Sequence, residues 1–417
     1  MSSFKEKYHK LLRYGTDFFG MDLRYLVSGA AWVTTGQGLA SIMAFLLTLA
    51  FANLLPKETY GLYNYLLSLS SFFNFLTLTG MNASVTQAVA SGNEGALRSS
   101  VKFQLKWNAL FGIAVLTLAA YYFFQANYVF AISLAILAVT SPLVAAFNTY
   151  GAFLVGKKDF KRDNLFSAIS TGAYALGMFL ALLVTKEVWE LVLVYSAVTL
   201  ATNIYFYIRT LRIYNPPETE SKDVMQYGKK LTYLGFINPI VAQMDKIILN
   251  HFWGPADLAV YFLARAVPDR IYSFIKTIVS TAFPKIAQRS NEEIDKVLWK
   301  RVFQGMALGL ILAAGYIIIA PSFFKYLLPK YSESVYYSQI LALIFIFAAP
   351  ARYLGEAFTA KKMIRPIVVT GVFANIFRII LYAILGAWGG IMGLILAELI
   401  FQSLGMIVNI SLWKFSR

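Results

Sequence analysis

The sequence contains no cysteine and only two histidines, His9 and His251. The absence of cysteine excludes disulfides and thiolate-bound metals, and it leaves the redox compartment unreadable. Two histidines so far apart do not predict a metal site, and we expect no resident cofactor. Acidic residues are also scarce: 21 stand against 37 basic ones, and the formal net charge is +16. In a soluble protein this charge would suggest a nucleic-acid partner. The distribution of the charge along the chain decides whether that interpretation applies.

Charge of either sign is rare overall, because 58% of the residues are hydrophobic and only 14% are charged. This is far from the composition of a soluble domain. Residues 1–21 lack the continuous apolar core and the small-residue cleavage site of a signal peptide. Apolar runs of about 20 residues are long enough to span a bilayer. They predict an all-α membrane protein with about twelve spans, at 26–51, 60–90, 103–124, 128–155, 164–185, 188–208, 231–252, 258–284, 302–321, 335–360, 366–386 and 389–413.

The basic residues are unevenly divided between the two sides of this predicted membrane domain. Loops on one side, with both termini, hold 27 Lys and Arg, the loops on the other side hold 4, and six lie within the spans. Such a bias predicts that the richer side is cytoplasmic. We therefore expect cytoplasmic termini, a multi-pass protein of a bacterial or archaeal cytoplasmic (inner) membrane, and no nucleic-acid partner.

A long internal loop divides the chain near its middle. It runs from Leu211 to Lys230 and contains Asn215-Pro216-Pro217-Glu218, a pattern typical of a linker. The predicted organisation, in chain order, is an interfacial amphipathic segment 1–25, a six-helix lobe 26–210, the linker 211–230, a second six-helix lobe 231–413 and a cytoplasmic tail 414–417.

The two predicted lobes resemble each other in sequence. Residues 54–63 match residues 252–261, 198 positions later, as short external turns that end in a small residue, an aliphatic residue and Tyr. Residues 151–158 match residues 355–362 at a shift of 204 positions. Since each lobe has an even number of spans, the repeat is parallel and encloses a cavity between the lobes.

The run Met244-Asp245-Lys246-Ile247-Ile248-Leu249-Asn250 and residues 253–264 resemble the seventh-to-eighth helix pattern of the MOP superfamily of exporters. Within that superfamily the chain is most similar to Wzx-type oligosaccharide flippases, which act on O-antigen and other polysaccharide precursors. The resemblance implies two six-helix lobes in a MATE-like V shape that work by alternating access. The related MurJ-like flippases use arginines in their first two helices, and residues 30–50 and 61–90 contain none.

All the charged residues placed well inside spans lie in the second lobe. A charge at the bilayer centre costs several kcal/mol, so it normally faces a watery cavity or a partner. Arg265, Asp269, Tyr272 and Lys276 share one helix face by their spacing. A net-basic interior suits an anionic cargo, although the charges could instead pair with one another. The predicted cargo-binding bases are Lys246, Arg265, Arg270, Lys276, Arg352 and Arg378, and the acids are Asp245, Asp269, Glu356 and Glu398.

The first lobe offers amides and hydroxyls in place of charges. Gln37, Asn74, Asn82 and Asn148 are the predicted sugar contacts. Hydrogen bonding between helices is the competing explanation for these side chains.

These patterns predict a flippase rather than an enzyme. Six bases and four acids leave the second lobe with a charge opposite to that of a diphosphate, which favours an undecaprenyl-diphosphate-linked glycan as cargo. The sequence has no G-x-x-x-x-G-K-[ST] motif, so the membrane potential or an H⁺ or Na⁺ gradient would supply the energy. Membrane lipids and other polysaccharide-assembly proteins are expected partners. The alternatives are a MATE-like drug/cation antiporter of the same fold and a polytopic glycan enzyme, which would need a large external loop that this chain lacks.

Overall fold

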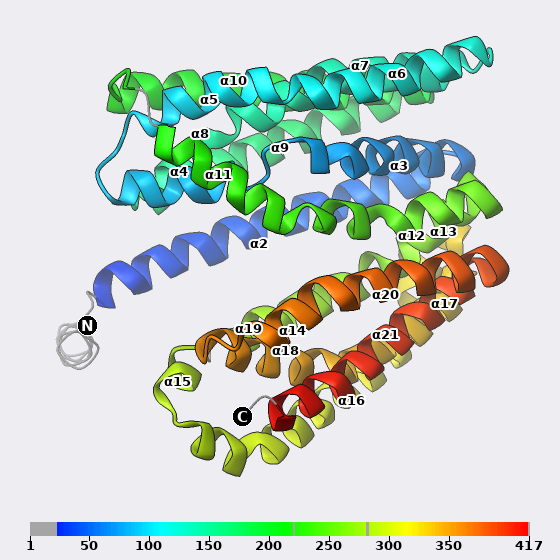
Figure 1. Cartoon of the computed structure of the whole chain (residues 1–417). Helices are drawn as coiled ribbons and strands as arrows, with labels where there is room; N and C mark the ends of the chain where they lie inside the picture. Colours follow the sequence, from blue (N-terminus) through cyan, green and yellow to red (C-terminus); the bar gives the residue numbers. More distant parts are fainter. Residues whose placement is uncertain (1–22, 220–221, 281–282, 416–417) are drawn as a thin grey trace, which may run out of the picture. The chain divides into compact units, whose positions relative to one another are not determined.

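The computed structural model describes residues 23–219, 222–280 and 283–415, without the side chains of residues 23–37, 39, 284 and 285. The predicted interfacial segment up to residue 22, the side chain of Gln37 and the last two residues lie outside the described part. The described residues form helices joined by turns and short connections, with no strand among them (Figure 1).

Helices that are long and apolar enough to cross a membrane occur along most of the described chain. Seven such stretches are present, of which residues 364–415 cover two predicted spans. Each of the twelve predicted spans coincides with one or more described helices. The predicted all-helical membrane fold is therefore confirmed, although several spans are broken where the sequence analysis expected continuous helices.

The packing of the described chain divides it into two compact units. The first unit holds residues 23–50, 76–185 and 189–235, and the second holds residues 51–75, 186–188 and 236–415. The lobe boundaries 26–210 and 231–413 stay predictions, and residues 51–75 group with the second unit.

The helices of the first unit come from the part of the chain that runs from α2 to α11. α6 and α7 pack side by side, and α4 packs against α8 and α11. Gly80 and Gly228 permit the close approach of α4 and α11, since a Cβ at Gly80 would lie 2.7 Å from the Gly228 carbonyl oxygen. The helices are α2 (Leu23–Leu54), α4 (Met81–Ala90), α5 (Ala96–Trp107), α6 (Ala109–Phe124), α7 (Tyr128–Phe147), α8 (Thr149–Gly156), α9 (Phe160–Val184), α10 (Val188–Tyr214) and α11 (Lys222–Gly235).

The second unit contains shorter helices, several of them consecutive pieces of one span. The single-turn elements η1, η2 and η3 are 3₁₀ helices, while η4 and η5 are π-helical turns. Its elements are α3 (Lys57–Phe72), η1 (Phe73–Leu76), α12 (Ile237–Trp253), α13 (Pro255–Ala266), α14 (Pro268–Ser280), α15 (Phe283–Gln288), α16 (Asn291–Leu327), η2 (Pro329–Tyr331), α17 (Ser334–Leu341), η3 (Ala342–Ile344), α18 (Phe345–Ala360), α19 (Ile364–Val368), η4 (Val369–Phe373), α20 (Ala374–Leu381), η5 (Tyr382–Gly386) and α21 (Ala387–Phe415).

The close packing of α3 on α12 and α13 explains why it belongs to the second unit. A Cβ at Gly61 would lie 1.7 Å from the Pro255 carbonyl oxygen, so only glycine allows this contact. Lys57 forms an ion pair with Glu333, and Asn53 Nδ2 donates to the Leu327 carbonyl at 2.9 Å. Packing of backbone on backbone has no signature in hydrophobic periodicity, so the span pattern alone does not predict it.

Candidate functional site

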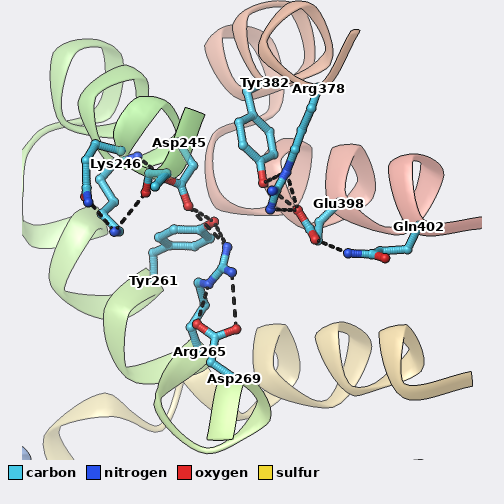
Figure 2. Close-up of polar contacts among 11 residues, drawn as sticks. Asp245, Lys246, Tyr261, Arg265, Asp269, Arg378, Tyr382, Glu398 and Gln402 are labelled. Carbon is cyan, nitrogen blue, oxygen red and sulfur yellow. Dashed lines mark hydrogen bonds and ion pairs between the residues drawn. The ribbon is translucent and has the colours of Figure 1, made fainter. Parts of the chain in front are cut away.

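A helical hairpin of the second unit places an arginine against a buried carboxylate. α12 ends at Gly254, whose φ of 90° lets the chain reverse, and Pro255 begins α13. Across this hairpin Asp245 accepts hydrogen bonds from Tyr261 Oη at 2.8 Å and Arg265 Nη1 at 3.1 Å (Figure 2).

The same arginine reaches a second acid one turn further along the chain. Arg265 Nε and Nη2 donate to the two carboxylate oxygens of Asp269 at 2.9 and 3.2 Å. The guanidinium also donates to Tyr261 Oη at 2.6 Å. Its side chain is only 17% exposed. Arg265 is therefore held by a carboxylate on either side, one of them bidentate, the geometry in which arginine binds most specifically.

A second hairpin repeats this arrangement near the C-terminus. Arg378 on α20 donates through Nη2 to Glu398 on α21 at 2.7 Å, and Tyr382 Oη donates to the same carboxylate. The other oxygen of Glu398 accepts from Gln402 Nε2 at 2.8 Å. The Arg378 guanidinium also lies 5.0 Å from the centre of the Phe401 ring. Glu398 is thus a buried acid that accepts hydrogen bonds from three side chains (Figure 2).

The two clusters have the same residue spacing, but in opposite directions along the chain. Tyr261 and Arg265 follow Asp245 by 16 and 20 residues, whereas Tyr382 and Arg378 precede Glu398 by 16 and 20. The hairpin tips also meet, because Trp253 Nε1 donates to the Gly386 carbonyl at 3.1 Å. We refer to these sets below as the Asp245 cluster (Asp245, Tyr261, Arg265, Asp269) and the Glu398 cluster (Glu398, Tyr382, Arg378, Gln402).

A further ion pair lies on α18. Arg352 Nη2 lies 2.8 Å from Glu356 Oε1, and Ser280 bridges the two side chains by accepting from Arg352 Nε and donating to Glu356. The alternative that the intramembrane charges pair with one another is therefore realised for Arg265, Arg352 and Arg378.

The lysines differ from the arginines. Lys246 Nζ donates to Gln243 Oε1 at 2.8 Å and to the Ala242 carbonyl, and Lys276 Nζ lies 4.1 Å from the centre of the Tyr272 ring. Within the described residues neither lysine has an ion pair with a carboxylate. The basic surplus of this unit thus includes Lys246 and Lys276. Arg270, also a predicted cargo contact, lies on α14 outside both clusters.

Sequence reasoning missed the two tyrosines of these clusters. Tyr261 and Tyr382 are almost completely buried, and each donates its hydroxyl hydrogen to the acid that the neighbouring arginine contacts. The available signal was a Tyr four residues from each Arg, on the same helix face.

The first unit contains a polar cavity with a volume of about 480 Å³. Asn82 and Asn148, two of the predicted sugar contacts, line it, whereas Asn74 lies in η1 of the second unit. The other lining residues are Ala83, Thr86, Tyr150, Gly151, Ala152, Asp163, Asn164, Ser167, Ser170, Thr171 and Asn203. Over the described residues no group of three or more His, Asp or Glu is arranged to hold a metal ion.

The sequence also matches a known family. The model of the polysaccharide biosynthesis protein family matches residues 26–290, more than half of the chain. The chain belongs to this family. No curated protein matches it in sequence.

Solved structures with the same fold are transporters of the MOP superfamily. The chain is similar to an inward-facing multidrug resistance MATE family transporter, with 13% identity, a TM-score of 0.64, and coverage of 91% of this chain and 93% of that one. A MOP superfamily transporter from Pyrococcus furiosus, described as having a binding pocket of reverse polarity, matches with 12% identity, a TM-score of 0.58, and coverage of 94% and 96%. The lipid II flippase MurJ in an inward closed conformation matches with 15% identity, a TM-score of 0.55, and coverage of 90% and 87%. The family and these folds confirm the resemblance to MOP exporters that the sequence predicted.

Proposed function

We propose that this member of the polysaccharide biosynthesis family is a flippase and not an enzyme. Its cargo is an undecaprenyl-diphosphate-linked oligosaccharide for surface polysaccharides such as O-antigen. The protein moves it from the cytoplasmic to the outer leaflet of a bacterial or archaeal inner membrane by alternating access. Family membership supports the class of process. The observation that carries the choice of cargo is the partly buried Arg378, held by Glu398 and Tyr382 beside a surplus of bases.

Arginine and lysine have different roles in this proposal. A guanidinium can bind two phosphate oxygens at once, while an ammonium acts as a compact point charge. Glu398 and Asp245 serve as counter-ions to Arg378 and Arg265 while no cargo is present. The incoming diphosphate then serves as a counter-ion to the arginines in part. Lys246 and Lys276 also attract the diphosphate, because neither forms an ion pair with a carboxylate.

The energy for transport comes from the membrane in this proposal. Moving negative charge out of a cell with a negative interior gains about 2.3 kcal/mol per charge per 100 mV. An H⁺ or Na⁺ gradient is the second source, and Asp245, Asp269, Glu356 or Glu398 would then bind the ion. Collapse of the membrane potential with ion gradients held constant should lower transport, and unchanged transport would exclude the potential as the source.

A pair of variants separates cargo binding from a structural role of Arg378. Arg378→Gln leaves Glu398 buried without its base, which typically costs about 3–5 kcal/mol. The double variant Arg378→Gln/Glu398→Gln removes both charges and should recover thermal stability and membrane abundance. Polysaccharide export in a flippase-deleted strain should stay lost in both variants. Export restored in the double variant would show that Arg378 only neutralises Glu398.

A drug/cation antiporter is the second candidate, because the MATE structures share the fold over nearly the whole chain. Such a protein should depend on its acids more than on its bases. Glu398→Gln alone would then abolish transport, Lys276→Gln would leave it intact, and expression of the chain would raise drug resistance.

A further inference from the structure

The polar cavity of the first unit has the size and lining of a ligand site. Its volume of about 480 Å³ lies within the range of small-molecule pockets, about 300–1,000 Å³. Its lining comes from α4, α8, α9 and α10 together with Asn148 between α7 and α8, and most of the lining side chains are polar.

Two asparagines in the wall of this cavity each donate one amide N–H to their own helix. Asn164 Nδ2 donates to the Phe160 carbonyl at 2.7 Å, and Asn203 Nδ2 donates to the Thr199 carbonyl at 2.8 Å. Each amide thus has one N–H committed to its own helix, one turn back. Asn203 is 7% exposed, and its Oδ1 is buried with no hydrogen-bond partner among the described residues. A buried acceptor without a partner costs free energy, so a ligand with a donor at this position would bind favourably.

Asp163 adds a carboxylate to the same wall of the cavity. In the described part of the chain it has neither an ion pair with a base nor a side-chain hydrogen bond. Its Oδ1 lies 3.3 Å from where a Cβ on Gly151 would be, so glycine leaves room beside it. The cavity is therefore rich in acceptors and negatively charged, in contrast to the base-rich clusters of the second unit.

We propose that this cavity is a sugar subsite that accepts a neutral or amino sugar residue of the transported glycan and excludes an acidic one. The inference rests on the proposed function, since it concerns the glycan part of the same cargo. Sugar hydroxyls donate to Asn164 and Asn203, and an ammonium group on the sugar pairs with Asp163. A uronic acid would place its carboxylate against Asp163, and such like-charge contact is unfavourable.

Sugar binding can be measured without transport. The probes are methyl glucoside, methyl glucosaminide and methyl glucuronide, added to the full chain in lipid nanodiscs and followed by saturation-transfer NMR. We expect methyl glucosaminide to bind best and methyl glucuronide not at all. Asp163→Asn should weaken methyl glucosaminide roughly tenfold, the difference between a charged and a neutral hydrogen bond, and should leave methyl glucoside almost unchanged. An equal loss for both sugars would assign Asp163 a purely structural role and overturn the proposal.

An asparagine pair supplies the matched control. Asn203→Leu should abolish binding of methyl glucoside and methyl glucosaminide. Asn375→Leu alters an amide with the same kind of bond, from Nδ2 to the Gly371 carbonyl one turn back, but in the other unit. It should leave binding intact. A cavity filled only by water, or one that binds Na⁺, would give no sugar signal in the wild-type chain and would overturn the inference.

The experiments distinguish a wrong sugar-subsite inference from a wrong flippase proposal. If the chain flips no glycan but the cavity is a sugar site, the probes bind while export is absent from every variant. If the flippase proposal holds and the subsite does not, Asp163→Asn leaves both probe binding and export unchanged while Arg378→Gln still abolishes export.

Discussion

Three of the intramembrane arginines form ion pairs with acids of their own unit. Arg265 contacts Asp245 and Asp269, Arg378 contacts Glu398, and Arg352 contacts Glu356. The pairs Arg265 with Asp269 and Arg352 with Glu356 follow from an i, i+4 spacing and could be predicted from the sequence. The pairs with Asp245 and Glu398 could not, because a helix hairpin brings residues 20 apart together only at one register.

The buried tyrosine of the Asp245 cluster should contribute to stability. Tyr261→Phe removes the hydroxyl that donates to Asp245 at 2.8 Å and leaves that carboxylate with fewer donors. We expect a loss of about 1–3 kcal/mol in the free energy of unfolding, measured by denaturation in mixed micelles. The control is Tyr326→Phe, whose side chain is 76% exposed. Equal stability of the two variants would contradict the contribution assigned to this hydrogen bond.

A second residue-scale prediction concerns the cap of α9. Asp159 Oδ1 accepts from the Arg162 backbone N–H at 3.0 Å, and Oδ2 contacts the Arg162 and Tyr214 side chains. Partial burial raises the pKa of Asp159, but the hydrogen bonds from Tyr214 and Arg162 outweigh it, and the net pKa is lowered. The stabilisation is therefore complete above the unfolded pKa of about 3.9 and is lost as the pH falls through the lower folded pKa.

Asp159→Ala should cost about 0.5–2 kcal/mol at pH 7, and the difference from the wild type should shrink as the pH is lowered below 4. Unfolding measured from pH 7 to pH 3 checks this. Asn127→Ala removes a cap that has no titratable group, at α7, where Asn127 Oδ1 accepts from the Phe130 N–H. Its cost should not depend on pH, and a parallel pH dependence in both variants would refute the assignment to Asp159.

At the scale of elements, glycines fix the hairpins that carry the charged clusters. Gly390 has a φ of 54° and a ψ of −133°, which kinks the chain near the start of α21, shortly after η5. A Cβ there would also lie 2.9 Å from Trp253 Cδ2. The neighbouring Gly389 faces open space. Glycine pairs in apolar spans suggest close packing, but the sequence does not tell which member needs to be glycine.

The difference between Gly390 and Gly389 gives a prediction at the scale of elements. Gly390→Ala should destabilise the protein by about 1–3 kcal/mol, because its backbone conformation is open almost only to glycine. Gly389→Ala should have little effect. Thermal unfolding of both variants, with polysaccharide export as a second readout, checks the pair. A neutral Gly390→Ala would mean that the hairpin turns without this conformation.

Helix existence was more predictable from the sequence than helix continuity. The described residues of the predicted span 258–284 belong mainly to three helices, α13, α14 and α15, and the break between α13 and α14 precedes Pro268, which lacks the backbone N–H of a helix interior. The predicted span 366–386 contains the π-helical turns η4 and η5, and no proline or glycine pattern in the sequence predicts them. Hydrophobic runs report burial in lipid, whereas π-helical turns depend on packing between neighbouring helices.

At the scale of the whole molecule, the two units differ in chemistry. The first unit holds an acceptor-rich cavity and the second holds the arginine clusters. The sequence predicted charges well inside the spans of the second lobe and none well inside those of the first, because charge within apolar spans can be counted directly. It did not predict Asp163, which lies in the first turn of α9, one residue before the predicted span 164–185.

The orientation in the membrane can be tested because the natural chain has no cysteine. Gln125→Cys and Ser91→Cys each introduce one thiol at an exposed position in a short connection. With cytoplasmic termini, a membrane-impermeant maleimide should label Gln125→Cys in intact cells and Ser91→Cys only after permeabilisation. The reverse labelling would invert the predicted topology.

The two hairpins with reversed spacing also bear on how the chain enters the membrane. Isolated arginines and acids at the centre of a spanning helix each cost about 2.5–3.5 kcal/mol on insertion. In α12 and α13, and again in α20 and α21, the compensating charge lies on the adjacent helix, across a short turn. Each hairpin can thus enter the bilayer as a pair whose charges already neutralise each other, without waiting for a partner from another helix of its unit or for cargo.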